Sequence, residues 1–199
     1  MQDPKSQLLI IAIGYFLFCF SWPWLRIRQM IGKNPIAFSR GSGLKPFVGK
    51  TFLTIILVET ATAFIFSIAP KFYEYLSPQV FLHHSFIQQL GFVLLLFSIA
   101  VTASAQYQMG SSWRIGIDED SRTELVIKGL YHYSRNPIYT GMLFGAIGFF
   151  LFLPNAVTLA CLAAGYLILR VEIHLEEEHM LRLHPQQYAE YMAKVRRWL

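Results

Sequence analysis

No charged residue stands between Ile138 and Leu169. A single helix over this run would be about 48 Å long, which exceeds the ~30 Å hydrocarbon core of a bilayer. Pro154 and Asn155 divide the run into two halves of about 24 Å each. We therefore predict a tight helical hairpin in a membrane, either two short spans or a re-entrant pair, whose two ends return to the same side.

Three further apolar stretches are each close to the ~20 residues that a helix needs to cross a bilayer. They are residues 7–25, 47–69 and 86–105. With 54% hydrophobic and 15% charged residues, the chain also differs from soluble domains, in which about a quarter of residues are charged. These features predict an all-α, multi-pass membrane helix bundle with five transmembrane helices, the last two forming the hairpin, and a cytoplasmic C-terminal helix.

The basic residues are unevenly distributed over the predicted loops. Residues 26–50 hold six Lys and Arg, residues 106–136 hold four, and the tail from Arg170 holds five. With five passes these segments share one side and carry 15 of the 17 basic residues, whereas Lys5 and Lys71 lie on the other. Because basic loops stay cytoplasmic, we predict an outside N-terminus and a cytoplasmic C-terminus, in a plasma, inner or endoplasmic reticulum membrane. The net charge of +5 thus reflects topology rather than nucleic-acid binding.

Residues 125–142 join a polar loop to the first half of the hairpin. Pro137 disfavours a helical conformation at Asn136 and fits the first turn of a helix, so Arg135 and Asn136 are expected where a helix begins. Free backbone N–H groups and the positive end of the helix dipole favour an anion there. The alternative is an interfacial anchor, since Arg and Tyr are common near headgroups. The hairpin also brings residues 131–139 beside residues 170–178, so both can line one cytoplasmic pocket.

The pattern Gly129-x-Tyr131-x-x-x-Arg135-Asn136-Pro137-x-Tyr139 resembles the signature of integral-membrane methyltransferases related to isoprenylcysteine carboxyl methyltransferase. Other stretches of this family resemble Gly110-Ser-Ser-Trp113, Glu176-Glu177, Tyr188-x-x-Tyr191 and Val195-Arg-Arg197-Trp198. The resemblance covers about half of the chain, so we predict three transmembrane helices in residues 1–105 and a cofactor-binding half in residues 106–199. Two positions depart from the family: many members have His in place of Asn136, and Leu183-His184 replaces a Phe-Gly pair.

The resemblance implies a methyltransferase that uses S-adenosylmethionine and a lipidic or apolar acceptor, such as a prenylated cysteine carboxylate, a phospholipid amine or a small thiol. Transfer from a sulfonium needs mainly positioning and exclusion of water, and an ionised carboxylate acceptor needs no strong base. Asn136 can hydrogen-bond but cannot titrate. The cofactor contacts that the resemblance implies are Leu125, Val126, Gly129, Leu130, Tyr131, Tyr133, Asn136, Tyr139, Glu176 and Glu177.

Arg135 and Glu177 are the predicted catalytic residues. The planar guanidinium of Arg135 can bind a carboxylate of cofactor or substrate through two hydrogen bonds. On a helix Glu177 shares its face with apolar residues, including Ile173, and should point inward, whereas Glu178 should be exposed and Glu176 lies on a more polar face. The alternative is that all three acids form a solvated face.

Trp113, Glu59 and Arg197 are weaker candidates for contacts with the acceptor. A carboxylate in the middle of a membrane helix, such as Glu59, indicates function by default, although a neutral, hydrogen-bonded group is the alternative. The sequence shows no His and Cys spacing typical of a metal site. Two other functions stay open: a membrane sterol-type reductase that uses NADPH, and a non-catalytic membrane protein of the same fold.

Overall fold

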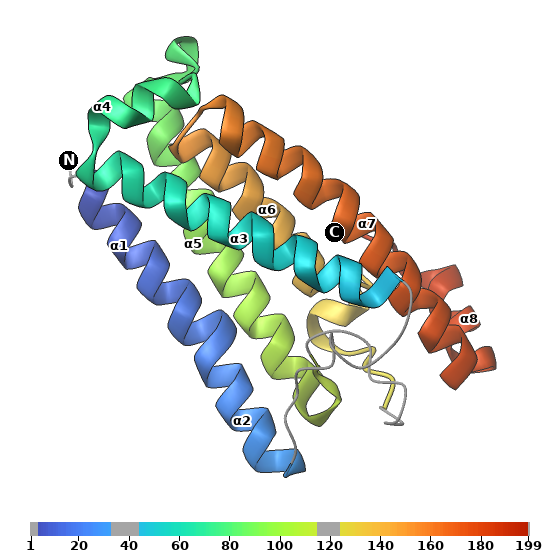
Figure 1. Cartoon of the computed structure of the whole chain (residues 1–199). Coiled ribbons are helices and arrows are strands. Elements are labelled where there is room, and N and C mark those ends of the chain that lie inside the picture. The colour runs from blue at the N-terminus through green and yellow to red at the C-terminus, as the bar shows by residue number, and fades with distance from the viewer. Residues whose placement is uncertain (1–3, 33–43, 115–123, 199) are drawn as a thin grey trace.

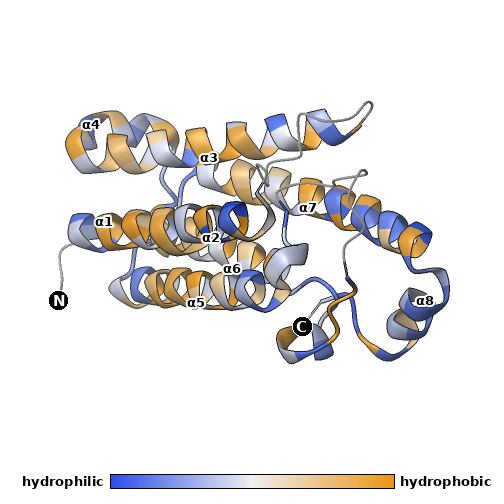
Figure 2. Ribbon diagram, turned by 90° about the horizontal axis from the view of Figure 1, so that it is seen from below, coloured by the Kyte–Doolittle hydropathy of each residue, from blue (hydrophilic) through white to orange (hydrophobic). Residues whose placement is uncertain are grey.

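The computed structural model describes residues 4–32, 44–114 and 124–198, and within these residues every regular element is a helix (Figure 1). Four helical segments of this part are long and apolar enough to cross a membrane. Hydrophobic residues run along the length of these helices, whereas hydrophilic residues gather at the end of α7 and in α8 (Figure 2). The protein is therefore a multi-pass integral membrane protein. The four segments are Pro4–Met30, Leu44–Ile68, Ser85–Ser112 and Ala156–Leu183.

The elements follow the order that the apolar stretches predict. The first segment joins α1, the π-helix η1 and α2, and α4, η2 and η3 form the connection between the two long helices α3 and α5. The bounds are α1 Pro4–Gly14, η1 Tyr15–Ser21, α2 Trp22–Ile31, α3 Leu44–Ile68, α4 Pro70–Tyr73, η2 Glu74–Leu76, η3 Val80–Leu82, α5 Ser85–Met109, η4 Gly110–Ser112, η5 Gly129–His132, α6 Pro137–Phe152, α7 Ala156–Leu183 and α8 Pro185–Lys194.

The predicted hairpin is confirmed as α6 and α7. Asn155 separates the two helices and caps α7, because its side-chain oxygen accepts from the backbone N–H groups of Val157 at 2.9 Å and Thr158 at 3.0 Å. Its amide group donates to the hydroxyl of Tyr73 at 3.2 Å. The backbone of Ser77 also accepts a hydrogen bond from Ala156, so the connection before α5 fixes the turn.

The prediction of two equal halves is wrong. Whereas α6 has 16 residues, α7 has 28 and continues from the apolar run through the acids around Glu177 to Leu183. The residues after Leu169 are mostly good helix formers, and Pro185 is the first residue that disfavours continuation. The candidate site therefore lies on the same rigid helix as the membrane span.

Helix α6 lies between α5 and α7 and packs closely on α5 (Figure 1). A side chain at Gly91 of α5 would come within 2.7 Å of the Gly148 carbonyl of α6, so the two backbones nearly touch. The hydroxyl of Ser98 donates to the Gly141 carbonyl at 2.6 Å. These contacts fix the short α6 and place its first residues beside the end of α5 and the last turns of α7.

Candidate active site

The turn before α6 is fixed against the end of α5. Gly129 has a φ of +65° and begins η5, and any side chain there would overlap the side chain of Gln108. The amide oxygen of Gln108 accepts a hydrogen bond of 2.7 Å from the backbone N–H of Leu130. The hydroxyl of Tyr131 donates to the Ala105 carbonyl at 3.4 Å. The positive φ thus favours the glycine of the motif, and a side chain there would also displace the Gln108 amide from Leu130.

Glu177 lies between two arginines, of which Arg135 is almost fully buried and Arg197 is 41% exposed at its side chain. One of its oxygens pairs with Nη2 of Arg135 at 3.0 Å and accepts from Nδ2 of Asn136 at 3.3 Å. Its other oxygen pairs with Nη2 of Arg197 at 2.7 Å. The Glu177 side chain is 5% exposed, and a carboxylate this buried is stable only with such partners. As predicted, α6 begins at Pro137, and the anion beside this helix end is a side chain of the chain itself.

Burial agrees with the helix-face argument for an inward Glu177 and an outward Glu178, but the face of Glu176 is not exposed as a whole, because Glu172 on it is buried. Glu177 and Ile173 are buried on the same side of α7. Glu178 is exposed and pairs along the helix surface with His174 at 3.3 Å and Arg182 at 4.0 Å. Exposed pairs of this kind contribute little to stability.

The same motif residues hold the end of the chain. Nη1 of Arg135 donates to the Val195 carbonyl at 2.8 Å, and its backbone N–H donates to the Arg196 carbonyl at 2.8 Å. Nδ2 of Asn136 donates to the Arg197 carbonyl at 3.2 Å. Because Arg197 in turn pairs with Glu177, the motif, α7 and the tail form one connected network.

Two further acids lie next to this network on α7. Glu172 is 2% exposed and interacts electrostatically with Glu176 and with Lys45 of α3. Glu176 is half-buried and hydrogen-bonds with the Tyr139 hydroxyl of α6. The two acids are four residues apart and share a helix face, so they bring two carboxylates together beside the first turn of α6.

Two buried tyrosines outside the membrane-spanning segments are hydrogen-bond donors near neutral pH. Burial raises the pKa of Tyr131 well above its usual value. Burial also raises the pKa of Tyr191 to about 12, although nearby Arg135 lowers it in part. The Tyr191 hydroxyl donates to the Tyr131 carbonyl. These phenols therefore tie α8 to the motif as neutral groups.

Other predicted site residues lie outside the buried network. Glu59 lies near Cys161, which precedes Glu176 on α7 by fifteen residues, or about 22 Å. Trp113 is buried directly after η4, and Tyr133 is 66% exposed. Leu125 and Val126 are half-buried just before the motif. Their predicted roles stay predictions.

Sequence reasoning did not single out three residues that shape this site. Glu172 could have been found from its spacing, because it lies one helical turn before Glu176 and therefore shares its face. No sequence pattern indicates Ser134 or Gln108, because each hydrogen-bonds to a backbone group far away in sequence. The Ser134 hydroxyl, for example, donates to the Arg197 carbonyl at 3.3 Å. Backbone partners leave no side-chain pattern that a sequence can show.

Comparison with known proteins supplies a family and a fold. The model of the phospholipid methyltransferase family matches residues 86–187. The chain is similar to the solved structure of a eukaryotic intramembrane Ras methyltransferase, isoprenylcysteine carboxyl methyltransferase, with a TM-score of 0.59 and 18% identity over 96% of this chain and 72% of that chain. No curated protein matches significantly. The structural likeness shows that the helices share the fold of a membrane methyltransferase.

Proposed function

The chain belongs to the phospholipid methyltransferase family, and from this premise we propose that it transfers a methyl group from S-adenosylmethionine to a lipidic or otherwise apolar acceptor. The observation that supports the proposal best is the pair Glu172 and Glu176 beside the motif. Carboxylates in a water-excluding site favour a cationic ligand, and the donor carries a sulfonium and an ammonium group. When bound, the donor supplies a methyl group that is already activated.

We propose that Glu176 and Tyr139 face the donor, and that Glu177 and Arg135 act by positioning. Both oxygens of Glu177 are held by arginines, and Arg135 already donates to Glu177 and to carbonyls of the tail. This network fixes the start of α6, where Asn136 lies. The family resemblance implies that the rest of the donor pocket is lined by Leu125, Val126, Gly129, Leu130, Tyr131, Tyr133 and Asn136.

Two acceptor groups are compatible with this site. A prenylated cysteine carboxylate is ionised at neutral pH and needs no base. A phospholipid amine must lose a proton, which Glu172 or Glu176 can accept. In either case the chain's task is to hold the acceptor in line with the donor and to exclude water.

The charge distribution supports a cytoplasmic site. We propose that α6, although only about 24 Å long, is a fifth pass, which leaves the N-terminus outside and the C-terminus cytoplasmic. Single cysteines at the exposed residues Ser111 and Ser77 test this topology. A membrane-impermeant maleimide should label Ser111→Cys only from the cytoplasmic side and Ser77→Cys only from the opposite side. Labelling of both from one side would refute the five-pass topology.

Calorimetry on the purified protein tests the function. S-adenosylhomocysteine, the product form of the donor, and NADPH are titrated separately. Binding of S-adenosylhomocysteine alone is expected. Binding of NADPH alone would instead support a sterol-type reductase, and binding of neither would support a non-catalytic protein of the same fold.

A further inference from the structure

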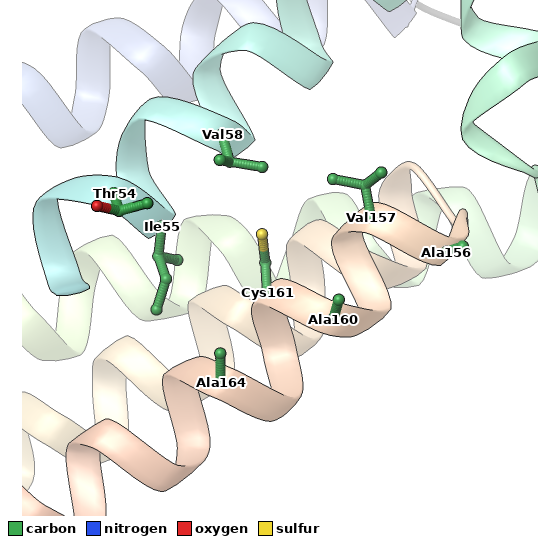
Figure 3. Close-up of a pocket in the computed structure, with 8 residues that line it drawn as sticks. All are labelled: Thr54, Ile55, Val58, Ala156, Val157, Ala160, Cys161 and Ala164. Carbon is green, nitrogen blue, oxygen red and sulfur yellow. The ribbon is translucent and has the colours of Figure 1, made fainter.

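An apolar groove of about 400 Å³ opens between α3 and α7, in the half of the bundle near the α6–α7 turn (Figure 3). In Figure 3 the side chains of Ile55 and Val58 on α3 point toward those of Val157 and Cys161 on α7 across this space. The hydroxyl of Thr54 donates to the Lys50 carbonyl within its own helix, so the groove offers an incoming group apolar surface. The lining includes Thr54, Ile55 and Val58 of α3 and Ala156, Ala160 and Ala164 of α7.

The alanines account for the hollow. Ala156, Ala160 and Ala164 recur every fourth residue and have side chains too short to fill the space below α3. Ala160 and Ala164 are exposed, so the groove is open along its side. A hydrocarbon chain can therefore enter from the bilayer without leaving an apolar environment.

The groove and the candidate active site lie on the same face of α7. Cys161 lines the groove, and Glu172 follows it by eleven residues, which is three helical turns and hence the same face of α7. Both residues face α3, because Glu172 interacts with Lys45 and Cys161 with Glu59. The contact between α3 and α7 thus leads from Glu172 to the level of Cys161 over about 16 Å.

We propose that this groove holds the far end of the acceptor's hydrocarbon chain, while the reacting head group lies beside Glu172 and Glu176. The inference rests on the proposed function and adds a requirement for chain length. Ala164 is eight residues before Glu172, so a chain must extend about 12 Å from the acids before it reaches the groove. The site should therefore discriminate against acceptors with short chains.

Photo-crosslinking tests this assignment without needing turnover. Two probes carry a diazirine at the chain end: a palmitoyl lysophosphatidylethanolamine and an S-farnesyl cysteine. We expect at least one probe to label residues 54–58 or 156–164, with displacement by its unlabelled parent and none by a parent with a four- or five-carbon chain. Labelling only elsewhere on the wild-type protein, or equal displacement by the short parent, would overturn the proposal.

Matched variants sharpen the result. Ala160→Phe fills the groove, whereas Ala163→Phe adds the same ring at a similar depth but outside the groove lining. Groove labelling should fall at least fivefold in Ala160→Phe and persist in Ala163→Phe, and an equal response would contradict the proposal.

Calorimetry with S-adenosylhomocysteine distinguishes failure of the groove assignment from failure of the proposed methyltransferase function. If the wild-type protein binds it but the groove is unlabelled, only the groove assignment fails, whereas absence of this binding refutes the methyltransferase proposal.

Discussion

The two ends of the α6–α7 hairpin are both closed by buried polar side chains, but the chemistry differs. At the turn, Asn155 makes neutral hydrogen bonds with the backbone of α7 and with Tyr73. At the open end, Glu177 is held by Arg135 and Arg197. Neutral groups with full sets of partners are inexpensive to bury, whereas buried charges carry a large desolvation cost.

Each end also fastens a distant segment of chain. The turn holds the connection around Ser77, and the open end holds the tail around Val195 through Arg135. The same task of fastening is therefore performed with neutral groups at one end and with charges at the other. The charged groups lie at the same end as the motif and the acids Glu172 and Glu176.

The largest effect is expected for Glu177→Gln. Removal of the charge leaves the buried Arg135 without its anion, and disruption of a buried pair costs about 3–5 kcal/mol. The partly exposed Arg197 can be solvated instead. Thermal unfolding should show this loss, and calorimetry should show at least a tenfold lower affinity for S-adenosylhomocysteine, about 1.4 kcal/mol. Glu178→Gln, at an exposed position, is the control and should change little. If Glu178→Gln is the damaging change, the assignment of α7 faces and the pocket built on it are wrong.

Arg135→Lys should have the next largest effect. Lysine keeps the charge beside Glu177 but cannot also donate to the carbonyls of Met192 and Val195. We expect a loss on the order of 1.5–3 kcal/mol in denaturant unfolding, faster trypsin cleavage at Lys194, and weaker binding of S-adenosylhomocysteine. Unchanged unfolding, cleavage and binding would reduce Arg135 to an interfacial anchor.

Asn155→Ala tests the neutral end. Loss of the cap should lower the free energy of unfolding by about 0.5–2 kcal/mol. The affinity for S-adenosylhomocysteine should stay the same, because Asn155 lies at the opposite end of α7 from Glu177. A parallel loss of affinity would show that the two ends of the hairpin are coupled, and would contradict the view that only the charged end supports ligand binding.

Tyr191→Phe should have the smallest effect, about 0.5–1.5 kcal/mol for one neutral hydrogen bond. Because the pKa of Tyr191 is raised from 10.0 to about 12, this contribution is complete below pH 10 and is lost as the pH rises through 12. Unfolding of wild-type and variant proteins between pH 7 and pH 9 should therefore differ by a constant amount. A difference that varies over this range would contradict the assigned hydrogen bond.

Features set by local chemistry could be predicted from the sequence. Pro137 begins α6, Asn155 separates the helices, and Glu177 points inward on a helix face. Each follows from backbone restriction or helical spacing, which a few neighbouring residues determine. The length of α7 did not follow from the apolar run, which ends at Leu169, because a helix need not end where it leaves the apolar core.

The partners of these residues could not be predicted in the same way. The pairing of Arg197 with Glu177 depends on how α8 folds back, and the tail is held through backbone carbonyls that every residue carries. Arg135 shows the consequence most clearly. Its guanidinium was expected to bind a carboxylate of a ligand, and the structure instead provides a carboxylate and two carbonyls from the chain.

Transfer of a tritiated methyl group from S-adenosylmethionine tests the central claim most directly. The wild-type protein and the Glu176→Gln and Glu178→Gln variants are reconstituted in vesicles with phosphatidylethanolamine and an S-farnesyl cysteine. The wild-type protein should label the lipid fraction, Glu178→Gln should match it, and Glu176→Gln should label it at least tenfold less. Label released by mild base would identify a methyl ester, and base-stable label an N-methyl amine. Wild-type labelling no higher than that of protein-free vesicles would contradict methyl transfer to either acceptor.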